Sequence, residues 1–334
     1  MNYSNTKIQG NYWDVFSYMN YLVLVTDENE FIICDWYSLN KFIVNRNLNE
    51  IDKLLLERFI VKRINLSFKS SITDFCISNK KIYITNDEGF FSSNELTDLN
   101  EIKFSKLWDN RSFSLNNNGK GNISLSCGND GLVEYSPNKY DLKLKKFESN
   151  IYSISENHST LSNYNNFDLY NISAIGESEL FSFDLGVNFK KEKLHNYKLK
   201  EIIMNVYNES EERLYFNNYD TNIISWMHKN KIYRIVGDNE IKVYSYDKNN
   251  HNIQFKKEET LYFQAQKGKI LRGHSTSFGN VIECENALVV NFSIDDYLNI
   301  YSEPIQWRVY PNSKAYLNHL HVIFDDYLEI FKFF

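Results

Sequence analysis

The chain has 334 residues, of which 43% are hydrophobic, 16% aromatic and 24% charged. This apolar fraction is too high for an intrinsically disordered protein, and the length suits one large all-β domain or two smaller domains. Only 4 residues are alanine, whereas Tyr and Phe number 24 each, and such usage favours strands over helices. The 43 acidic residues outnumber the 37 basic ones, and no continuous basic stripe of the kind that binds duplex phosphates is present, so we expect no direct binding of duplex nucleic acid.

The beginning of the sequence and its apolar runs predict no targeting to a membrane. Residues 1–13 contain no apolar stretch behind a basic segment, so we expect no signal peptide. The longest apolar runs, residues 21–25 and 287–290, are too short to span a bilayer. The expected location is the cytoplasm, or the nucleus if the source is eukaryotic. The four cysteines lie in separate apolar runs without a CxxC pair, which favours buried, reduced thiols over zinc ligands or disulfides: Cys34, Cys76, Cys127 and Cys284.

Short strand-like runs, each followed by a tight polar turn and a second run, recur along the whole chain. Asp, Asn and Gly at the turns tolerate the positive φ angles that hairpins need. The most similar copies are IDDYLNIY and FDDYLEIF, which begin at Ile294 and Phe324. In chain order the seven hairpins lie at residues 26–33, 85–91, 128–136, 176–183, 237–244, 294–301 and 324–331.

Seven hairpins in 334 residues give an average period of about 48 residues, the length of a four-stranded propeller blade. The sequence therefore predicts an all-β fold, a single β-propeller domain over residues 1–334 with seven blades. Residues 184–229 and 247–285 are long enough to contain a further hairpin, so the count could differ by one. Phe334 directly follows the last hairpin, which leaves that blade one strand short. Residues 5–10 are available to supply the strand, and pairing of the N- and C-terminal strands would close the ring.

Residues 49–62 depart from the hairpin pattern. Ile51, Leu55 and Phe59 stand near helical spacing, with Asn47 and Asn49 as candidate caps. This spacing predicts a short helical insertion between blades. An outer strand with a charged loop is the alternative.

One segment resembles a WD40 repeat. It comprises residues 271–275 (LRGHS) and 287–302 (ALVVNFSIDDYLNIYS). Gly273 and His274 match the Gly-His pair that opens a WD40 repeat, and Asp295 matches its turn acid, whereas the closing Trp-Asp dipeptide is replaced by Tyr-Ser. The resemblance implies that His274 and Asp295, with a hydroxyl such as that of Ser293, share the hydrogen-bond network that ties a loop to a turn. It covers one blade well and indicates no subfamily.

The sequence contains no recognisable catalytic or metal-binding motif. GxSxG, HExxH, P-loop, GxGxxG and CxxC patterns are all absent, so we predict no catalytic residue, cofactor or metal site. His319 and His321 would share one face of a strand, but no third ligand can be identified. A polar face on a late strand is the simpler interpretation of these two histidines.

Acidic residues recur at the hairpin turns, where turn geometry alone favours them. Because equivalent turns of a propeller emerge on one face, we expect a ring of carboxylates that attracts a basic peptide or a Lys/Arg-rich protein surface in a salt-dependent way. The alternative is an acidic rim that only aids solubility. The candidate partner-binding residues are Asp27, Glu28, Asp87, Glu88, Asp238, Glu240, Asp295, Asp296, Asp325 and Asp326.

A second candidate site is the glycine-rich, basic segment at residues 267–280. Lys267, Lys269, Arg272 and His274 lie among three glycines whose backbone N–H groups are suited to an anion nest. A loop between blades, with glycines that serve turn geometry, is the simpler interpretation.

Two classes of function remain after these exclusions. The favoured class is a non-enzymatic protein–protein interaction scaffold, monomeric alone or a subunit of a complex. The alternative is a propeller enzyme or a small-ligand-binding protein that uses the mouth of the central channel. Fold alone does not decide between them.

Overall fold

The computed structural model describes most of the chain. Within residues 141–145 and 153–225, only backbone is described, and only for the residues given next. The described residues are 1–96, 99, 101–117, 123–127, 132–137, 141–145, 153–162, 165–174, 177–184, 200–201, 205–207, 213–215, 225–228, 231–236, 239–249, 252–263, 270–293, 295–311 and 313–334.

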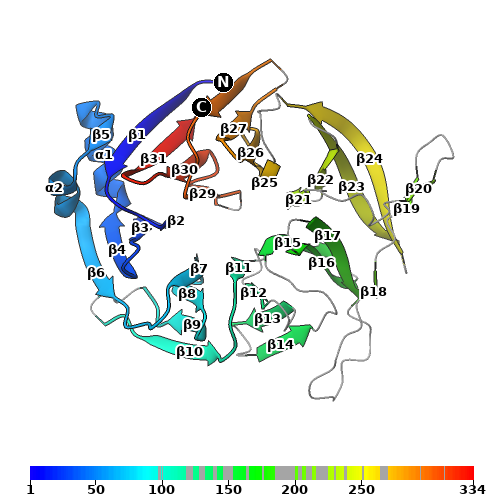
Figure 1. Cartoon of the computed structure of the whole chain (residues 1–334), viewed down its shortest axis with the longest axis horizontal. Coiled ribbons are helices and arrows are strands. Elements are labelled where there is room, and N and C mark those ends of the chain that lie inside the picture. The colour runs from blue at the N-terminus through cyan, green and yellow to red at the C-terminus, as the bar shows by residue number, and fades with distance from the viewer. Residues whose placement is uncertain are drawn as a thin grey trace.

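The described strands form mainly antiparallel sheets that stand radially around a central channel (Figure 1). We letter the strands of each sheet A to D from the channel outward. The first three sheets are β2 (Asp14–Tyr18), β3 (Tyr21–Val25), β4 (Glu30–Asp35) and β6 (Ile60–Asn65); β7 (Ile72–Ser78), β8 (Lys81–Asn86), β9 (Gly89–Ser93) and β10 (Phe104–Trp108); and β11 (Ser114–Asn117), β12 (Ile123–Ser126), β13 (Leu132–Ser136) and β14 (Asp141–Lys145).

The remaining sheets follow in chain order around the channel. They are β15 (Ser153–Ser162), β16 (Asn165–Ala174), β17 (Glu177–Asp184) and β18 (Lys200–Glu201); β21 (Ser225–His228), β22 (Lys231–Val236), β23 (Glu240–Asn249) and β24 (Asn252–Tyr262), extended by β19 (Asn205–Tyr207) and β20 (Arg213–Tyr215); β25 (Ile270–Ser275), β26 (Asn280–Cys284), β27 (Ala287–Asn291) and β28 (Tyr297–Ile300); and β29 (Gln306–Val309), β30 (His319–Ile323) and β31 (Tyr327–Phe333), joined by β1 (Tyr3–Gln9) and β5 (Glu50–Ile51). The predicted all-β propeller is confirmed. The count of seven blades and the closure of the whole ring stay predictions, since residues 118–269 are described only in part.

The two chain termini lie side by side in the last sheet (Figure 1). β1 pairs antiparallel with β31 over seven residue pairs, from Tyr3 opposite Phe333 to Gln9 opposite Tyr327. β5 pairs in parallel with the other edge of β1 through two residue pairs. The N-terminal strand therefore takes the outer place beside the last hairpin that the sequence leaves vacant.

The insertion between β4 and β6 is helical but begins earlier than predicted. It contains α1 (Trp36–Arg46), β5, α2 (Lys53–Leu56) and the 3-10 turn η1 (Glu57–Phe59). Asp35 caps α1 by accepting a hydrogen bond from the backbone N–H of Ser38, and Asp52 caps α2 through Leu55. Asn47, a candidate N-cap in the sequence, instead ends α1 in the left-handed conformation. The prediction of helix within residues 49–62 is thus confirmed for residues 53–59, and α1 was missed.

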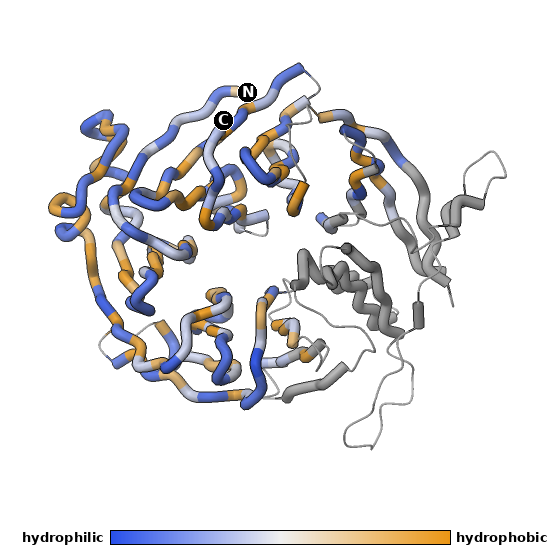
Figure 2. Tube along the Cα trace, in the orientation of Figure 1, coloured by the Kyte–Doolittle hydropathy of each residue, from blue (hydrophilic) through white to orange (hydrophobic). Residues whose placement is uncertain are grey.

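Hydrophobic cores fill the spaces between those neighbouring sheets whose side chains are described. One core joins the first and last sheets and the insertion, with Ile8, Leu24, Leu39 and Leu328 fully buried. Figure 2 colours both hydrophobic and hydrophilic residues along the strands. The central strands β27 and β30 are buried over their whole length, whereas the outer strand β6 alternates between half-buried and exposed residues. All four cysteines are buried and none forms a disulfide. Among the described residues, no helix combines the length and apolar character needed to cross a bilayer.

The disc has two faces that carry different turns. In an antiparallel sheet the A–B and C–D turns lie at one end and the B–C turn at the other. The A–B connections of the first and last sheets lie at the same end of the disc. Tyr316, in the A–B connection of the last sheet, donates a hydrogen bond to Met19 O, in the A–B connection of the first sheet. At the opposite end, Gly10 N, just after β1, donates to Asp326 O in a B–C turn. We call these two surfaces the AB face and the BC face.

Candidate functional site

Three neighbouring sheets present predicted acidic turns on the BC face. These turns join β3 to β4, β8 to β9 and β30 to β31, and they carry Asp27–Glu28, Asp87–Glu88 and Asp325–Asp326. Glu240 begins β23 at another B–C turn, whereas Asp238 lies outside the described residues. The structure therefore brings most of the predicted carboxylates to one face.

Asp295 and Asp296 do not lie on that face. They belong to the C–D turn between β27 and β28, and Asp296 Oδ2 contacts the N-terminal ammonium of Met1 at 2.6 Å, beside the start of β1. Asp325 and Asp326 lie where β1 ends. The near-identical sequences IDDYLNIY and FDDYLEIF thus occupy different turns, and their equivalence in the predicted repeat is wrong. The short motif specifies a tight turn but not its position in the sheet.

The carboxylates of the BC face divide into engaged and free groups. Asp87 forms an ion pair with Arg111 Nε at 2.6 Å, and Glu88 Oε1 accepts hydrogen bonds from the backbone N–H groups of Lys69 and Ser70. Four further side chains on this face are exposed and have no ion-pair partner among the described residues: Asp27, Glu28, Asp325 and Asp326.

The predicted anion-binding segment is only partly visible. Lys267 and Lys269 lie outside the described residues. Arg272 pairs with Glu283, donates to Gln306 Oε1 at 2.6 Å and lies over the ring of Trp307. Its charge is therefore already balanced within the protein.

The segment that resembles a WD40 repeat uses its residues differently from the expectation. Gly273 and His274 lie inside the innermost strand β25, and strands β26 and β27 separate that strand from the turn with Asp295. Two intervening strands place the two side chains more than about 10 Å apart, so they do not share the implied network. His274 Nδ1 contacts Ser275 O at 2.9 Å, and burial lowers the pKa of His274 to about 4.

Two neighbours of His274 make the contacts that join this sheet to the preceding one. Ser275 Oγ accepts a hydrogen bond of 2.7 Å from Trp226 Nε1 and donates one of 2.5 Å to Asn280 Oδ1. A Cβ at Gly273 would lie 2.5 Å from the Trp226 ring, so glycine is needed here for close approach. Neither role is visible in the sequence.

His319 and His321 lie on β30 as predicted, but both are buried rather than on a polar face. They pack with Tyr310 and Tyr316, and the Tyr310 hydroxyl contacts His321 Nδ1 at 3.0 Å while it accepts a hydrogen bond from Ser17 N. Burial lowers the pKa of both imidazoles, that of His319 to about 4, so both rings are neutral near pH 7. In the part of the chain that is described, no group of three His, Cys, Asp or Glu side chains is arranged for a metal ion.

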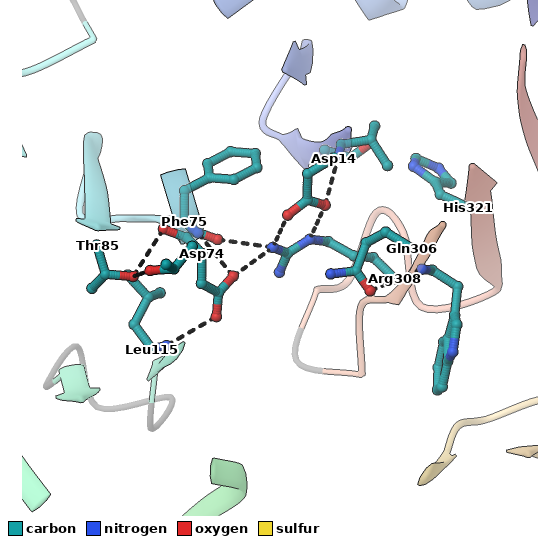
Figure 3. Close-up of polar contacts among 12 residues, drawn as sticks. Asp14, Asp74, Phe75, Thr85, Leu115, Gln306, Arg308 and His321 are labelled. Carbon is teal, nitrogen blue, oxygen red and sulfur yellow. Dashed lines mark hydrogen bonds and ion pairs between the residues drawn. The ribbon is translucent and has the colours of Figure 1, made fainter. Parts of the chain in front are cut away.

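A polar cluster that was not predicted from the sequence lies in the channel. Arg308 on β29 donates from Nε to Asp14 Oδ1 at 2.7 Å and from Nη2 to Asp14 Oδ2 at 2.5 Å, and Nη2 also reaches Asp74 Oδ1 at 2.9 Å (Figure 3). Asp74 Oδ2 accepts from the backbone N–H of Leu115 at 2.9 Å. The chain of contacts runs through β29, β2, β7 and β11 and so ties four neighbouring sheets together.

The electrostatics of this cluster follow from burial. Asp14 is fully buried, and the side chains of Arg308 and Asp74 are only 18% and 17% exposed. The two carboxylates raise the pKa of Arg308, which stays charged, whereas burial raises the pKa of Asp74 despite the nearby guanidinium. Arg308 also lies over the rings of Phe16 and Phe75, at 5.5 and 5.2 Å from their centroids.

A cavity of about 410 Å³ occupies the channel mouth on the AB face. It is lined by the ends of inner strands and by the connection that follows β29, and it includes Phe16, Leu115, Asn117, Arg308 and Tyr310. His274 from β25 lines it as well. Among the described residues, the cavity and the carboxylates of the BC face are two candidate sites.

Comparisons with known proteins identify the fold and no closer relationship. No protein-family profile matches the chain. No curated protein is a significant match to it. Among solved structures, the β-propeller domain of Cps50 (Swd1) from Myceliophteria thermophila is 9% identical with a TM-score of 0.58, covering 99% of this chain and 100% of that one. The WD40 β-propeller domain of Doa1 is 10% identical with a TM-score of 0.56, over 99% and 97% of the two chains.

A third similar structure is PorZ, an essential bacterial surface component of the type-IX secretion system of Porphyromonas gingivalis. It is 11% identical with a TM-score of 0.54, and the match covers 96% of this chain but 46% of PorZ. The chain therefore spans less than half the length of PorZ. At such identities the similarity is one of fold, and the fold is a WD40-like β-propeller without an assigned subfamily.

Proposed function

We propose that the chain is a non-enzymatic protein-interaction scaffold that presents carboxylates of its BC face to a basic peptide or a Lys/Arg-rich protein surface. The observation that carries this proposal is the group Asp27, Glu28, Asp325 and Asp326. These side chains lie on B–C turns of two neighbouring sheets, are exposed and have no ion-pair partner among the described residues. We call them the acidic patch.

Physical properties of the patch support recognition of a basic partner. Several like charges on one face of a rigid scaffold produce a field that accelerates association with a cationic surface and weakens as salt screens it. The WD40-like propeller supports the general class, since its sheets hold many surface turns in fixed relative positions. Fold similarity alone does not identify a partner.

The chain contains a matched pair of turns with which to test this proposal. D325K/D326K reverses two charges of the acidic patch, and D295K/D296K reverses two charges in the near-identical sequence on the AB face. The probe is a fluorescent Lys/Arg-rich peptide titrated with the full chain at low and at raised salt. We expect D325K/D326K to weaken binding by about tenfold or more, and D295K/D296K to have a much smaller effect. Equal effects of the two variants would show that only net charge matters and would refute the proposal.

The natural partner can be sought with the same variants. Tagged wild-type chain and both variants are incubated with native extract at two salt concentrations, and bound proteins are identified by mass spectrometry. A basic protein captured in stoichiometric amounts by wild type and D295K/D296K, but lost with D325K/D326K, is the expected result. Capture that is the same for all three chains would contradict the assignment of the acidic patch.

A further inference from the structure

The cavity on the AB face is lined by apolar side chains and by one cation whose charge is balanced within the protein. Phe16 and Leu115 are among the apolar side chains, and Arg308 is the cation. Its guanidinium pairs with Asp14 and Asp74, so it offers a ligand no uncompensated positive charge. The volume of about 410 Å³ lies within the range of pockets that hold small apolar groups. The interior therefore suits an uncharged, apolar group.

Two residues beside the mouth of this cavity have a backbone conformation that does not suit their type. Apart from glycine, the described residues with positive φ include three asparagines, and asparagine adopts this conformation readily. The other two are Met19, at φ 53°, and Lys80, at φ 63°. Met19 lines the cavity, and Tyr18, which also lines it, accepts a hydrogen bond of 2.9 Å from Lys80 N. Backbone preference explains neither residue type, and such positions concentrate at functional sites.

The side chain of Met19 is 58% exposed although it is apolar. Its carbonyl oxygen accepts a hydrogen bond from the Tyr316 hydroxyl, so the turn is held against the last sheet. A thioether side chain adapts its shape to apolar groups that pack against it. Met19 therefore extends the apolar surface of the cavity outward to the AB face.

The charge around the mouth of the cavity is positive. Lys80 and Lys314 are exposed and form no ion pair within the described part of the chain, and Lys314 follows Ser313, which lines the cavity. The described residues of the A–B connections include no Asp or Glu. Carboxylates of this face lie in the C–D connections, farther from the channel, as at Glu95 and Asp296. The mouth therefore favours an anionic group, in contrast to the acidic patch on the opposite face.

We propose that the mouth of this cavity docks an acidic peptide segment of a partner protein that carries one aromatic side chain between its carboxylates. The aromatic side chain enters the cavity past Met19, and the flanking carboxylates pair with Lys80 and Lys314. An aromatic ring fits this role because it buries much apolar area and anchors many interfaces. This site does not rest on the acidic patch. It gives the scaffold a second partner, of opposite charge, on its other face.

Peptide probes test the two halves of this occupant separately. The first is a short fluorescent peptide with a single Phe flanked by Asp and Glu, the second has Ala in place of Phe, and the third has Asn and Gln in place of the acids. Each is titrated with the full chain and followed by fluorescence anisotropy. We expect the first to bind at least about tenfold more tightly than either of the others, a difference of about 1.4 kcal/mol. Equal binding of the first probe and either altered probe would overturn the proposal.

A small molecule is the competing occupant of the cavity. N-acetyl-phenylalaninamide carries the aromatic ring without the carboxylates and is titrated against the same chain. We expect it to bind at least about tenfold more weakly than the acidic Phe peptide, since it lacks the ion pairs at the mouth. Binding as tight as that of the peptide would overturn the docking proposal and indicate a small-molecule site.

The apolar contact at the mouth is tested by M19N. This substitution removes the exposed apolar side chain and introduces the residue type that suits the positive φ angle. The variant should therefore unfold at the same temperature as wild type or higher, yet bind the acidic Phe peptide about tenfold more weakly. Wild-type affinity in a folded M19N chain would contradict the assignment.

The charges at the mouth are tested by K80N/K314N, with K41Q/K53Q as the matched control. The control removes two exposed lysines from the helical insertion instead of the mouth. K80N/K314N should weaken binding of the acidic Phe peptide by about tenfold and reduce its salt dependence, whereas K41Q/K53Q should have a much smaller effect. Equal losses in the two variants would show that only net charge matters and would refute the site. K80N/K314N should not weaken binding of the Lys/Arg-rich peptide, so failure of the scaffold proposal and failure of this one are distinguishable.

Discussion

Aspartates occur in two contrasting regions of this propeller, the channel and the acidic patch. Asp14 is fully buried and bonded through both oxygens to Arg308, whereas Asp325 and Asp326 are exposed at a tight turn. In the channel, the carboxylate connects strands of different sheets. In the patch, turn geometry accounts for the residue type and leaves the charge available for a partner. The same side chain therefore stabilises the fold in one region and, in the function proposed above, supports recognition in the other.

Among the changes considered, removal of the Arg308 charge should reduce the free energy of unfolding most. R308M keeps much of the side-chain volume but leaves Asp14 and Asp74 without their shared counter-ion. Breaking a buried ion pair in this way costs about 3–5 kcal/mol, so we expect a loss of that size in the free energy of unfolding, measured with urea.

Arg111 is the matched control for Arg308. Its ion pair with Asp87 is more than half exposed on both sides, and exposed pairs contribute about 0–1 kcal/mol. R111M should therefore change the free energy of unfolding by less than 1 kcal/mol, on the order given for such pairs. Similar losses in R308M and R111M would show that the channel cluster has no special structural role.

The next largest loss of stability is expected on lowering the pH, because the buried histidines have a lowered pKa in the folded chain. His319 has a pKa of about 4 in the folded chain, against about 6.5 when unfolded. Between these values the unfolded chain binds more protons, so stability falls as the pH falls from about 7 to 4. The shift corresponds to roughly 3 kcal/mol, and His321, whose pKa is also lowered, acts in the same direction.

The contribution of His319 can be isolated by H319F, which keeps an aromatic ring beside Tyr316. His319 packs against Tyr316 and His321, and Lys332 lies opposite it on β31. Thermal unfolding is recorded for both chains from pH 7.5 to 4.5. We expect a shallower decline in H319F, and an identical pH profile in the two chains would contradict the prediction.

The elements that sequence reasoning located are those with short-range signals. Runs around Asp-, Asn- and Gly-containing turns predict hairpins such as β3–β4 and β30–β31. The edge strand predicted at residues 5–10 is observed as β1, which pairs with β31 over residues 3–9. Helix α1 was missed because WYSLNKFIVNR is rich in aromatic and β-branched residues, which favour strands. Its capping pair Asp35 and Ser38 was the available signal.

The candidate sites depended on contacts that sequence spacing does not reveal. Arg308 and Asp14 are separated by 294 positions, and no local pattern marks either residue as a member of a buried ion pair. The assignment of turns to faces failed at Asp295 and Asp296 because the same four residues, Asp-Asp-Tyr-Leu, fit a B–C turn and a C–D turn equally well. Such motifs encode local backbone geometry, whereas the face they occupy depends on how many strands precede them in the sheet.

The smallest change in stability is expected in the acidic patch itself. D325N/D326N removes two charges but keeps residues that suit a tight turn, and neither carboxylate has an ion-pair partner among the described residues to lose. The free energy of unfolding should therefore change by less than about 0.5 kcal/mol. Binding of the Lys/Arg-rich peptide should nevertheless weaken and lose part of its salt dependence, because two of the four free carboxylates are neutralised. A substantial loss of stability with unchanged binding would reverse the roles assigned to the two regions, since the patch aspartates would then hold the fold as Asp14 does.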